Sequence, residues 1–159
     1  MANDGGMIAL LEQWLADTLK ALTSGGKAIF NTADVWRHQI GATAGGMEAF
    51  SRFEPFAFVS YQATDAAREG DYDLRQVIEF AILIGVESPK AGDARIGESS
   101  AKLGVSKIRD LVIAAFDRQH PAGGLKCDEI YYTGDFEVLD SPKRYMIQMN
   151  FETSYLAVE

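Results

Sequence analysis

The stretch Leu74-Arg75-Gln76-Val77-Ile78-Glu79-Phe80-Ala81-Ile82-Leu83-Ile84-Gly85-Val86-Glu87 contains the clearest period-two pattern of the chain. Every second side chain from Leu74 to Val86 is apolar except Gln76, and from Val77 to Gly85 the residues of the opposite face are apolar, small or acidic. Successive side chains of a strand point to opposite faces of a sheet. A strand that is largely apolar on both faces is typical of a sheet centre. We therefore predict a central strand over residues 74–87.

Further segments show strand patterns on both sides of this one. Residues 56–63 alternate behind Pro55, whose missing N–H is harmless just before a strand. Residues 127–139 and 144–158 flank Asp140-Ser141-Pro142-Lys143, a tetrapeptide typical of a hairpin turn. In the last strand one face is apolar and the other polar, so we expect helices on one side of the sheet only.

Two amphipathic helices are predicted from apolar residues that recur every three or four positions. The first covers residues 6–22 and ends at Ser24-Gly25-Gly26, because glycine tolerates the left-handed conformation that closes a helix. A short extended piece over residues 27–31 is expected next. The second helix covers about residues 99–119, with Pro121 as its stop and Gly104 as an unfavourable residue near its start.

Residues 34–52 have no single period, because glycines interrupt a run of large apolar side chains. We expect a broken helix or an ordered loop there. The element order then predicts one α+β domain over residues 1–159, with a mostly antiparallel twisted sheet of four to five strands. Its two main helices are expected to pack on one face of the sheet.

Composition excludes several classes of protein. The chain has 159 residues, with 15 basic and 23 acidic side chains and a net charge of −8. This charge has the wrong sign for binding phosphate backbones, so no direct sequence-specific nucleic-acid binding is expected. No apolar run approaches the roughly 20 residues of a membrane span, and the first residues lack the basic start of a secretory signal. A single cysteine, Cys127, fits a reducing compartment, and we expect a cytoplasmic protein.

No motif for catalysis, cofactor binding or metal binding emerges. His38 and His120 have no partners at catalytic or zinc-binding spacing, and both are interpreted as structural residues. Cys127 opens a strand without a nearby base, so a structural thiol is the favoured interpretation. Asp71 and Asp73 lack the further ligands of a calcium loop and are interpreted as parts of a solvated loop. We predict a protein that is not an enzyme and carries no cofactor or metal.

Several local sequence patterns resemble those of the tail-terminator, or tail-completion, proteins of Mu-like contractile-tailed bacteriophages and prophages. They are an opening helix with a glycine turn, the strands Phe56-Ala57-Phe58-Val59 and Val77-Ile78-Glu79-Phe80-Ala81-Ile82-Leu83-Ile84, the helix 105–116 and the hairpin 136–151. The resemblance implies a virion protein of the head–tail junction that caps the tail tube as a ring, with six copies as the expected number. It implies the tube protein and the head connector as partners, and assembly in the bacterial cytoplasm. An acidic lumen would repel sliding DNA, although plain solubility explains the acidity equally well.

A closed ring needs a contact between two different patches of neighbouring subunits. Candidate contact residues are the large apolar side chains of the irregular segment and charged residues of two polar loops: Trp36, Met47, Phe50, Phe53, Asp71, Asp73, Lys90 and Arg95. Burial inside the monomer is the alternative for the four apolar residues.

Two other functions are compatible with the sequence. The first is a small-ligand binding domain or an enzyme, with a pocket on the apolar sheet face near the tyrosines 131, 132, 145 and 155. A filled core would dismiss this hypothesis. The second is an adaptor or immunity protein whose acidic surface covers a basic partner.

Overall fold

The computed structural model of the chain describes residues 4–36, 54–69, 73–88, 95, 98–99, 102–122, 125–141 and 143–157. Its main sheet has five strands in the order β3-β4-β5-β9-β8. Their bounds are β3 Thr32–Val35, β4 Phe56–Glu69, β5 Asp73–Glu87, β9 Arg144–Ala157 and β8 Tyr131–Asp140. Strand β3 is parallel to β4, and the other neighbouring pairs are antiparallel. The predicted α+β class with a mostly antiparallel sheet is confirmed, and β3 makes the sheet mixed.

Strand β5 is the centre of this sheet, as its sequence predicts. It pairs with β4 from Asp73 to Gly85 and with β9 from Leu74 to Glu87. Its helix-facing side chains are almost completely buried, and they are Ile78, Phe80, Ile82, Ile84 and Val86. Gln76, which interrupts the apolar pattern, is also buried, and its Oε1 accepts a hydrogen bond of 2.7 Å from the Tyr155 hydroxyl. The polar interruption is therefore satisfied by the neighbouring strand.

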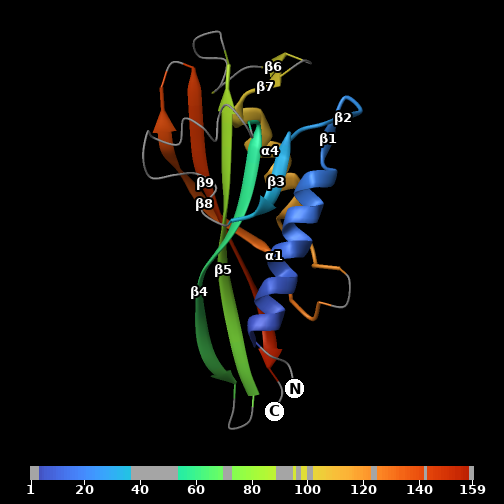
Figure 1. The fold of residues 1–159 in the computed structure, drawn as a ribbon. Helices are drawn as coiled ribbons and strands as arrows, with labels where there is room; N and C mark the ends of the chain where they lie inside the picture. Colours follow the sequence, from blue (N-terminus) through green and yellow to red (C-terminus); the bar gives the residue numbers. More distant parts are fainter. Residues whose placement is uncertain are drawn as a thin grey trace.

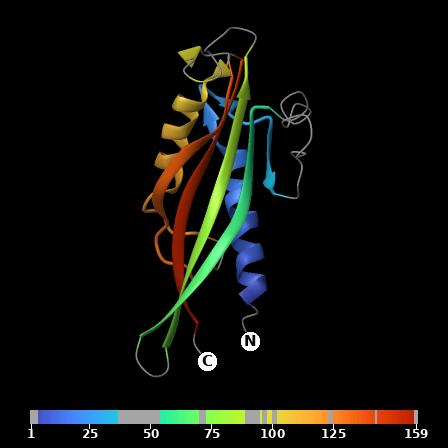
Figure 2. The ribbon, with the colours of Figure 1, turned by 90° about the vertical axis from the view of Figure 1, so that its left-hand side faces the viewer.

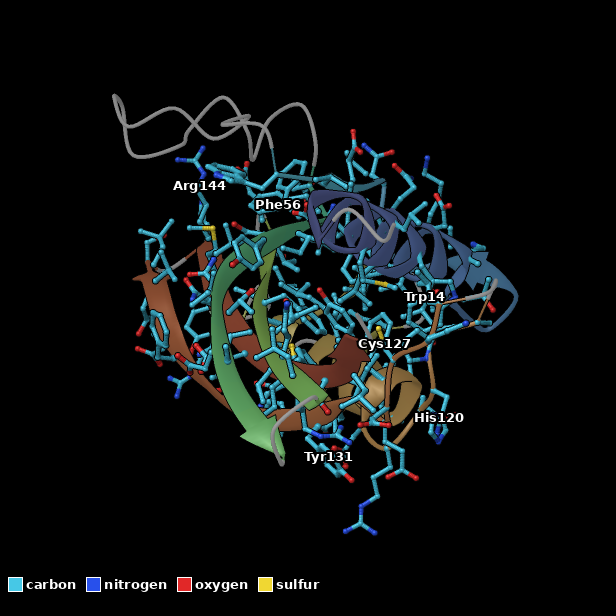
Figure 3. All side chains as sticks on the ribbon, turned by 90° about the horizontal axis from the view of Figure 1, so that it is seen from below. Trp14, Phe56, His120, Cys127, Tyr131 and Arg144 are labelled. Atoms are coloured by element: carbon cyan, nitrogen blue, oxygen red, sulfur yellow. The ribbon has the colours of Figure 1, made fainter. Side chains whose placement is uncertain are left out.

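Both long helices cover the same face of the sheet (Figures 1 and 2). Helix α1 (Asp4–Ala21) packs on β3 and β4, whereas α4 (Val105–Phe116) packs on β5, β8 and β9. Figure 3 shows Trp14 and Cys127 on this helix side, with Arg144 projecting away from the sheet. The buried residues of the two helices follow the predicted spacing, and they are Leu11, Leu15, Leu19, Val105, Ile108, Val112 and Phe116. One core thus joins both helices to the sheet.

Helix α4 is shorter at both ends than predicted. Strands β6 (Glu98–Ser99) and β7 (Lys102–Leu103) form a small antiparallel ladder where the helix was expected to begin. Gly104 caps the helix with an extended backbone, so this glycine precedes the helix rather than weakening it. At the other end the backbone of Asp117 is extended, with a ψ of 126°, which ends the helix at Phe116, before Pro121 is reached.

The region after α1 also differs from the expectation of one extended piece over residues 27–31. Strands β1 (Thr23–Ser24) and β2 (Lys27–Ala28) form a separate hairpin, turned by Gly25 and Gly26 with φ values of 60° and 79°. Asp34 and Val35 belong to strand β3, so the expected broken helix or loop is wrong at its start. The rest of that segment, from residue 37, lies outside the described residues.

The strand boundaries were predicted with unequal accuracy. Strand β4 continues to Glu69, well beyond the predicted end at residue 63, and pairs with β5 to its last residue. Strand β8 begins at Tyr131 rather than at Cys127. The residues before it bond elsewhere, because Asp128 N–H donates to Ser154 O and Ile130 N–H donates to Gln119 O. The chain thereby ties the end of α4 to β9 before it enters β8.

Glu12 joins α1 to the point where β4 loses its partner β3. The pairing of β3 with β4 ends at Val35 and Val59, and Tyr61 N–H donates to Glu12 Oε2 at 3.3 Å. Burial raises the pKa of the Glu12 carboxyl, and the hydrogen bond from Tyr61 opposes this rise. The folded chain therefore takes up this proton more readily than the unfolded chain, and stability falls as pH rises from 4.5 through the raised pKa.

We predict that Glu12→Gln stabilises the protein at pH 7 and has little effect at pH 4. The glutamine oxygen still accepts from Tyr61 N–H, but no charge is buried. Urea unfolding at both pH values measures the difference. Asp17→Asn, on the exposed side of α1, is the control for removal of one negative charge. A gain for Glu12→Gln no larger than that of the control at pH 7 contradicts the prediction.

Gly85 is required by a close contact on the sheet face opposite the helices. A Cβ atom at this position would lie 2.2 Å from Cζ of Phe56, whose side chain is fully buried. Such an overlap forces the ring or the backbone to move.

We predict that Gly85→Ala lowers the free energy of unfolding by about 1–3 kcal/mol. Phe56→Leu removes the ring atoms that collide, so the double variant should lose less stability than the two single losses added together. Urea unfolding of the four proteins forms the cycle. Additive losses would show that the ring and the glycine are not in contact.

Candidate interaction surface

The sheet face turned away from α1 and α4, here called the outer face, is built from rows of side chains that cross the strands. The registers align one residue each from β4, β5, β9 and β8 in every row. In that strand order the rows are Phe56, Gly85, Met146, Leu139; then Phe58, Leu83, Gln148, Phe136; then Ser60, Ala81, Asn150, Gly134; and finally Ala63, Glu79, Glu152, Tyr131. The outer face therefore changes from apolar to small and then to acidic along the strands.

The first two rows contain a second, smaller core. Phe56, Phe58 and Met146 are buried, with Leu83 and Leu139 packed against them. The Trp36 ring also contacts this cluster, with its centroid 6.0 Å from that of Phe58 in an edge-to-face arrangement. The predicted polar outer face is thus apolar at one end. The prediction of polarity came from β9 alone, whereas the apolar side chains come mainly from β4.

The apolar character continues to the exposed edge strand β8. Phe136 is 51% exposed, Val138 45% and Tyr131 46%. Large apolar side chains gathered on a surface mark contact sites more often than single ones do. This strand is therefore the most apolar exposed edge among the described parts of the sheet.

Two irregularities modify the edge of β8. The register to β9 shifts between Tyr132 and Gly134 and again between Glu137 and Leu139, so Thr133 and Val138 are extra residues. Bulges and charged residues on an edge strand discourage uncontrolled strand addition. A partner that binds this edge is therefore expected to contact its side chains rather than to pair with its backbone as an added strand.

Charged residues at the two ends of the outer face form ion pairs. The Arg75 guanidinium contacts both the Asp128 carboxylate and the Ser154 hydroxyl, and the Arg144 Nε donates to Glu87 Oε2 at 2.6 Å. The hydrogen bond from Ser154, together with Arg75, lowers the pKa of Asp128 despite the desolvation that opposes it.

The middle of the outer face is hollow. A depression of about 320 Å³ crosses the sheet and is lined by residues of four strands. Its polar lining residues are Gln62, Glu79, Thr133, Asn150 and Glu152. The row of small residues that includes Ala81 and Gly134 lies at the same level of the strands.

On the helix side, Arg109 joins α4 to β8. Its Nε donates to Asp135 Oδ2 at 2.5 Å and its Nη2 donates to the Tyr132 hydroxyl at 3.0 Å. The Tyr132 hydroxyl in turn donates to the same Asp135 oxygen. These bonds raise the pKa of Arg109 further above its ordinary value, with Asp135 as the main cause. The cluster holds the edge strand against the helix.

The sequence-predicted contact residues are only partly within the described structure. Trp36 packs inside the monomer against Phe58, and its role at a subunit interface stays a prediction. Asp73 begins β5 opposite Glu69. The Arg95 guanidinium lies 5.7 Å from the centroid of the Tyr145 ring, a cation–π distance. The other predicted contacts lie outside the described residues: Met47, Phe50, Phe53, Asp71 and Lys90.

Three of the four tyrosines expected to line a ligand pocket pack on the helix side. The Tyr145 hydroxyl donates to Glu137 Oε1 at 2.6 Å, Tyr155 bonds Gln76, and Tyr132 packs edge-to-face against Phe151. Tyr131 lies in an outer-face row instead. Sequence reasoning missed the outer hollow, because its residues come together only through strand register.

Residues considered for chemistry are spread over the structure. His120 is exposed, with its Nε2 3.8 Å from Glu129 Oε1, and Figure 3 shows it projecting outward. His38 lies outside the described residues. In the ranges that the structure describes, no three His, Cys, Asp or Glu side chains gather in a metal-binding arrangement. No helix in these ranges is both long and apolar enough to span a membrane.

In comparisons with protein-family models and with curated proteins, nothing matches this chain.

Cys127 is buried on the helix side, with its Sγ 4.0 Å from Met7 Sδ. Burial, together with the nearby negative charge of Asp128, raises the pKa of the thiol to about 11. The thiol is therefore protonated at neutral pH, as expected for a structural cysteine.

We predict that Cys127 reacts with a disulfide reagent such as DTNB at least about 100-fold more slowly in the native protein at pH 8 than in urea. The raised pKa leaves little thiolate, and burial blocks access. Release of the coloured thiolate measures the rate. Reaction of the native protein as fast as free cysteine contradicts the buried, protonated thiol.

Proposed function

We propose that this chain is a structural protein of phage or prophage tails that completes the tail tube as part of the head–tail junction. It assembles as a homo-oligomeric ring, with six subunits as the expected number. Its partners are further copies of itself, the tube protein and the head connector. It resides in the virion tail after assembly in the bacterial cytoplasm.

The observation that carries the proposal is the one-sided covering of the sheet. Both long helices lie on one face, and among the described residues no helix covers the outer face or the edge strand β8. Phe136 and Val138 are about half exposed there, whereas the other phenylalanines of the sheet are buried: Phe56, Phe58, Phe80 and Phe151. Exposed apolar side chains of this size on an edge are typical of a surface that a partner covers.

The order of elements supports the family resemblance. A first helix with a glycine hairpin, two long strands, a second helix and a final two-stranded hairpin follow one another in the chain. A ring further requires two different patches on each subunit. Strand β8 and the opposite side of the sheet, formed by β3 and β4, lie at the two ends of the strand order and supply such a pair.

The test uses the genes beside that of this chain. We predict that tube and sheath genes lie next to it and that the encoded tube protein, mixed with this chain, forms tubes with a ring at one end. Negative-stain electron microscopy shows the ends directly. Absence of tail genes from the neighbourhood, or bare tube ends at saturating protein, contradicts the proposal.

A matched pair of variants identifies the surface. Phe136→Asp should prevent ring formation, because a charge replaces an apolar contact at the β8 edge. Leu10→Asp changes a leucine on α1 that is 60% exposed and should leave ring formation unchanged. Equal behaviour of the two variants would contradict the assignment of the contact to β8.

A further inference from the structure

We propose that the hollow on the outer face is a docking groove for a basic segment of a partner protein. The groove crosses four strands between the apolar row of Phe58, Leu83 and Phe136 and the acidic row of Glu79 and Glu152. This inference rests on the geometry of the hollow and holds whether or not the chain belongs to a phage tail.

Beside the acidic row, small residues follow one another across the sheet, and Asn150 of this row lines the groove. Ser60, Ala81 and Gly134 occupy three of the four positions of one row, with Asn150 as the fourth. Neighbouring strands lie about 4.8 Å apart, so four strands give a groove about 14 Å long. This length accommodates a few residues of an extended peptide or one turn to two turns of helix.

Bulges at both ends of the groove bring polar side chains into it. Gln62 is the extra residue at the bulge in β4, and Thr133 is the extra residue at one bulge in β8. Both side chains line the hollow. Bulges commonly redirect side chains next to functional sites. Here two bulges, in the non-neighbouring strands β4 and β8, each place a residue in the lining of the same depression.

The charge of the groove is not compensated within the described part of the chain. Glu79 and Glu152 stand directly opposite each other on β5 and β9 and line the same hollow. Like charges in direct cross-strand register destabilise a sheet. The other pairs on this face, Arg75 with Asp128 and Arg144 with Glu87, combine opposite charges. A cationic side chain placed between the two glutamates would remove their repulsion.

The occupant that matches both walls has lysine or arginine side chains beside apolar ones. Its basic groups lie against Glu79 and Glu152, which line the groove, and its apolar groups extend toward the neighbouring outer-face row of Leu83 and Phe136. A nucleic-acid strand is disfavoured, because its phosphates would meet two carboxylates. The groove is therefore assigned to a protein segment.

The test is a titration with a fluorescein-labelled short peptide of alternating lysine and leucine, followed by fluorescence anisotropy. The peptide should bind the native chain, and a peptide of alternating glutamate and leucine should not. We expect Glu79→Gln/Glu152→Gln to weaken binding about tenfold. Asp17→Asn/Asp140→Asn removes the same charge from other exposed positions and should weaken binding less than twofold.

Two further measurements locate the peptide. Amide chemical shifts of residues 60, 81, 134 and 150 should change on titration, and those of α1 should not. Thr133→Lys, at an exposed position of the groove rim, should abolish binding by supplying a competing cation. The proposal is overturned if the control double variant weakens peptide binding as much as the glutamate variant, or if the chemical shifts of these residues do not change. Peptide binding would then reflect only the general attraction of a basic peptide to an acidic protein.

Discussion

The constraint on which the structure depends is that β5 is hydrogen-bonded on both sides along almost its entire length. Because β5 has a neighbouring strand on each side, its side chains point alternately to the helix side and to the outer face. Its helix-facing residues are apolar and draw α1 and α4 to that side. The outer residues differ in size and charge, from Gly85 beneath the Phe56 ring to Glu79, and this difference shapes the outer face.

The outer face combines a small core at one end with the proposed docking groove further along the same strands. At one end the Phe56 ring lies over Gly85 and forms a small core with Phe58 and Met146. Further along, the same strands carry Glu79 and Glu152 next to a row of small residues. Rigid strands hold the acidic groups at constant positions, because both are anchored in the longest ladder of the sheet. The apolar end stabilises the sheet and the polar end remains available for binding.

The proposed tail function and the proposed groove concern adjacent surfaces with different chemistry. The edge of β8 presents Phe136 and Val138, which suits a contact between copies. The groove presents paired carboxylates, which suits a basic segment of another protein. A subunit that joins like copies along one edge while binding a different protein on its face is a suitable component for a junction between two assemblies. The two groove carboxylates belong to the acidic composition from which no nucleic-acid binding is expected.

The sequence by itself determined the two long helices and the four long strands, the face that the helices cover and the buried residues of β5, because helix and strand periods are local properties of side chains. It also indicated the glycine turn at residues 25–26. Only the tertiary structure decided that β3 pairs in parallel with β4, that α4 begins at Val105 and that Gln62 and Thr133 bulge into one hollow. The physical reason is register: which residues become neighbours across strands depends on pairing over long separations, and a single bulge shifts every residue beyond it.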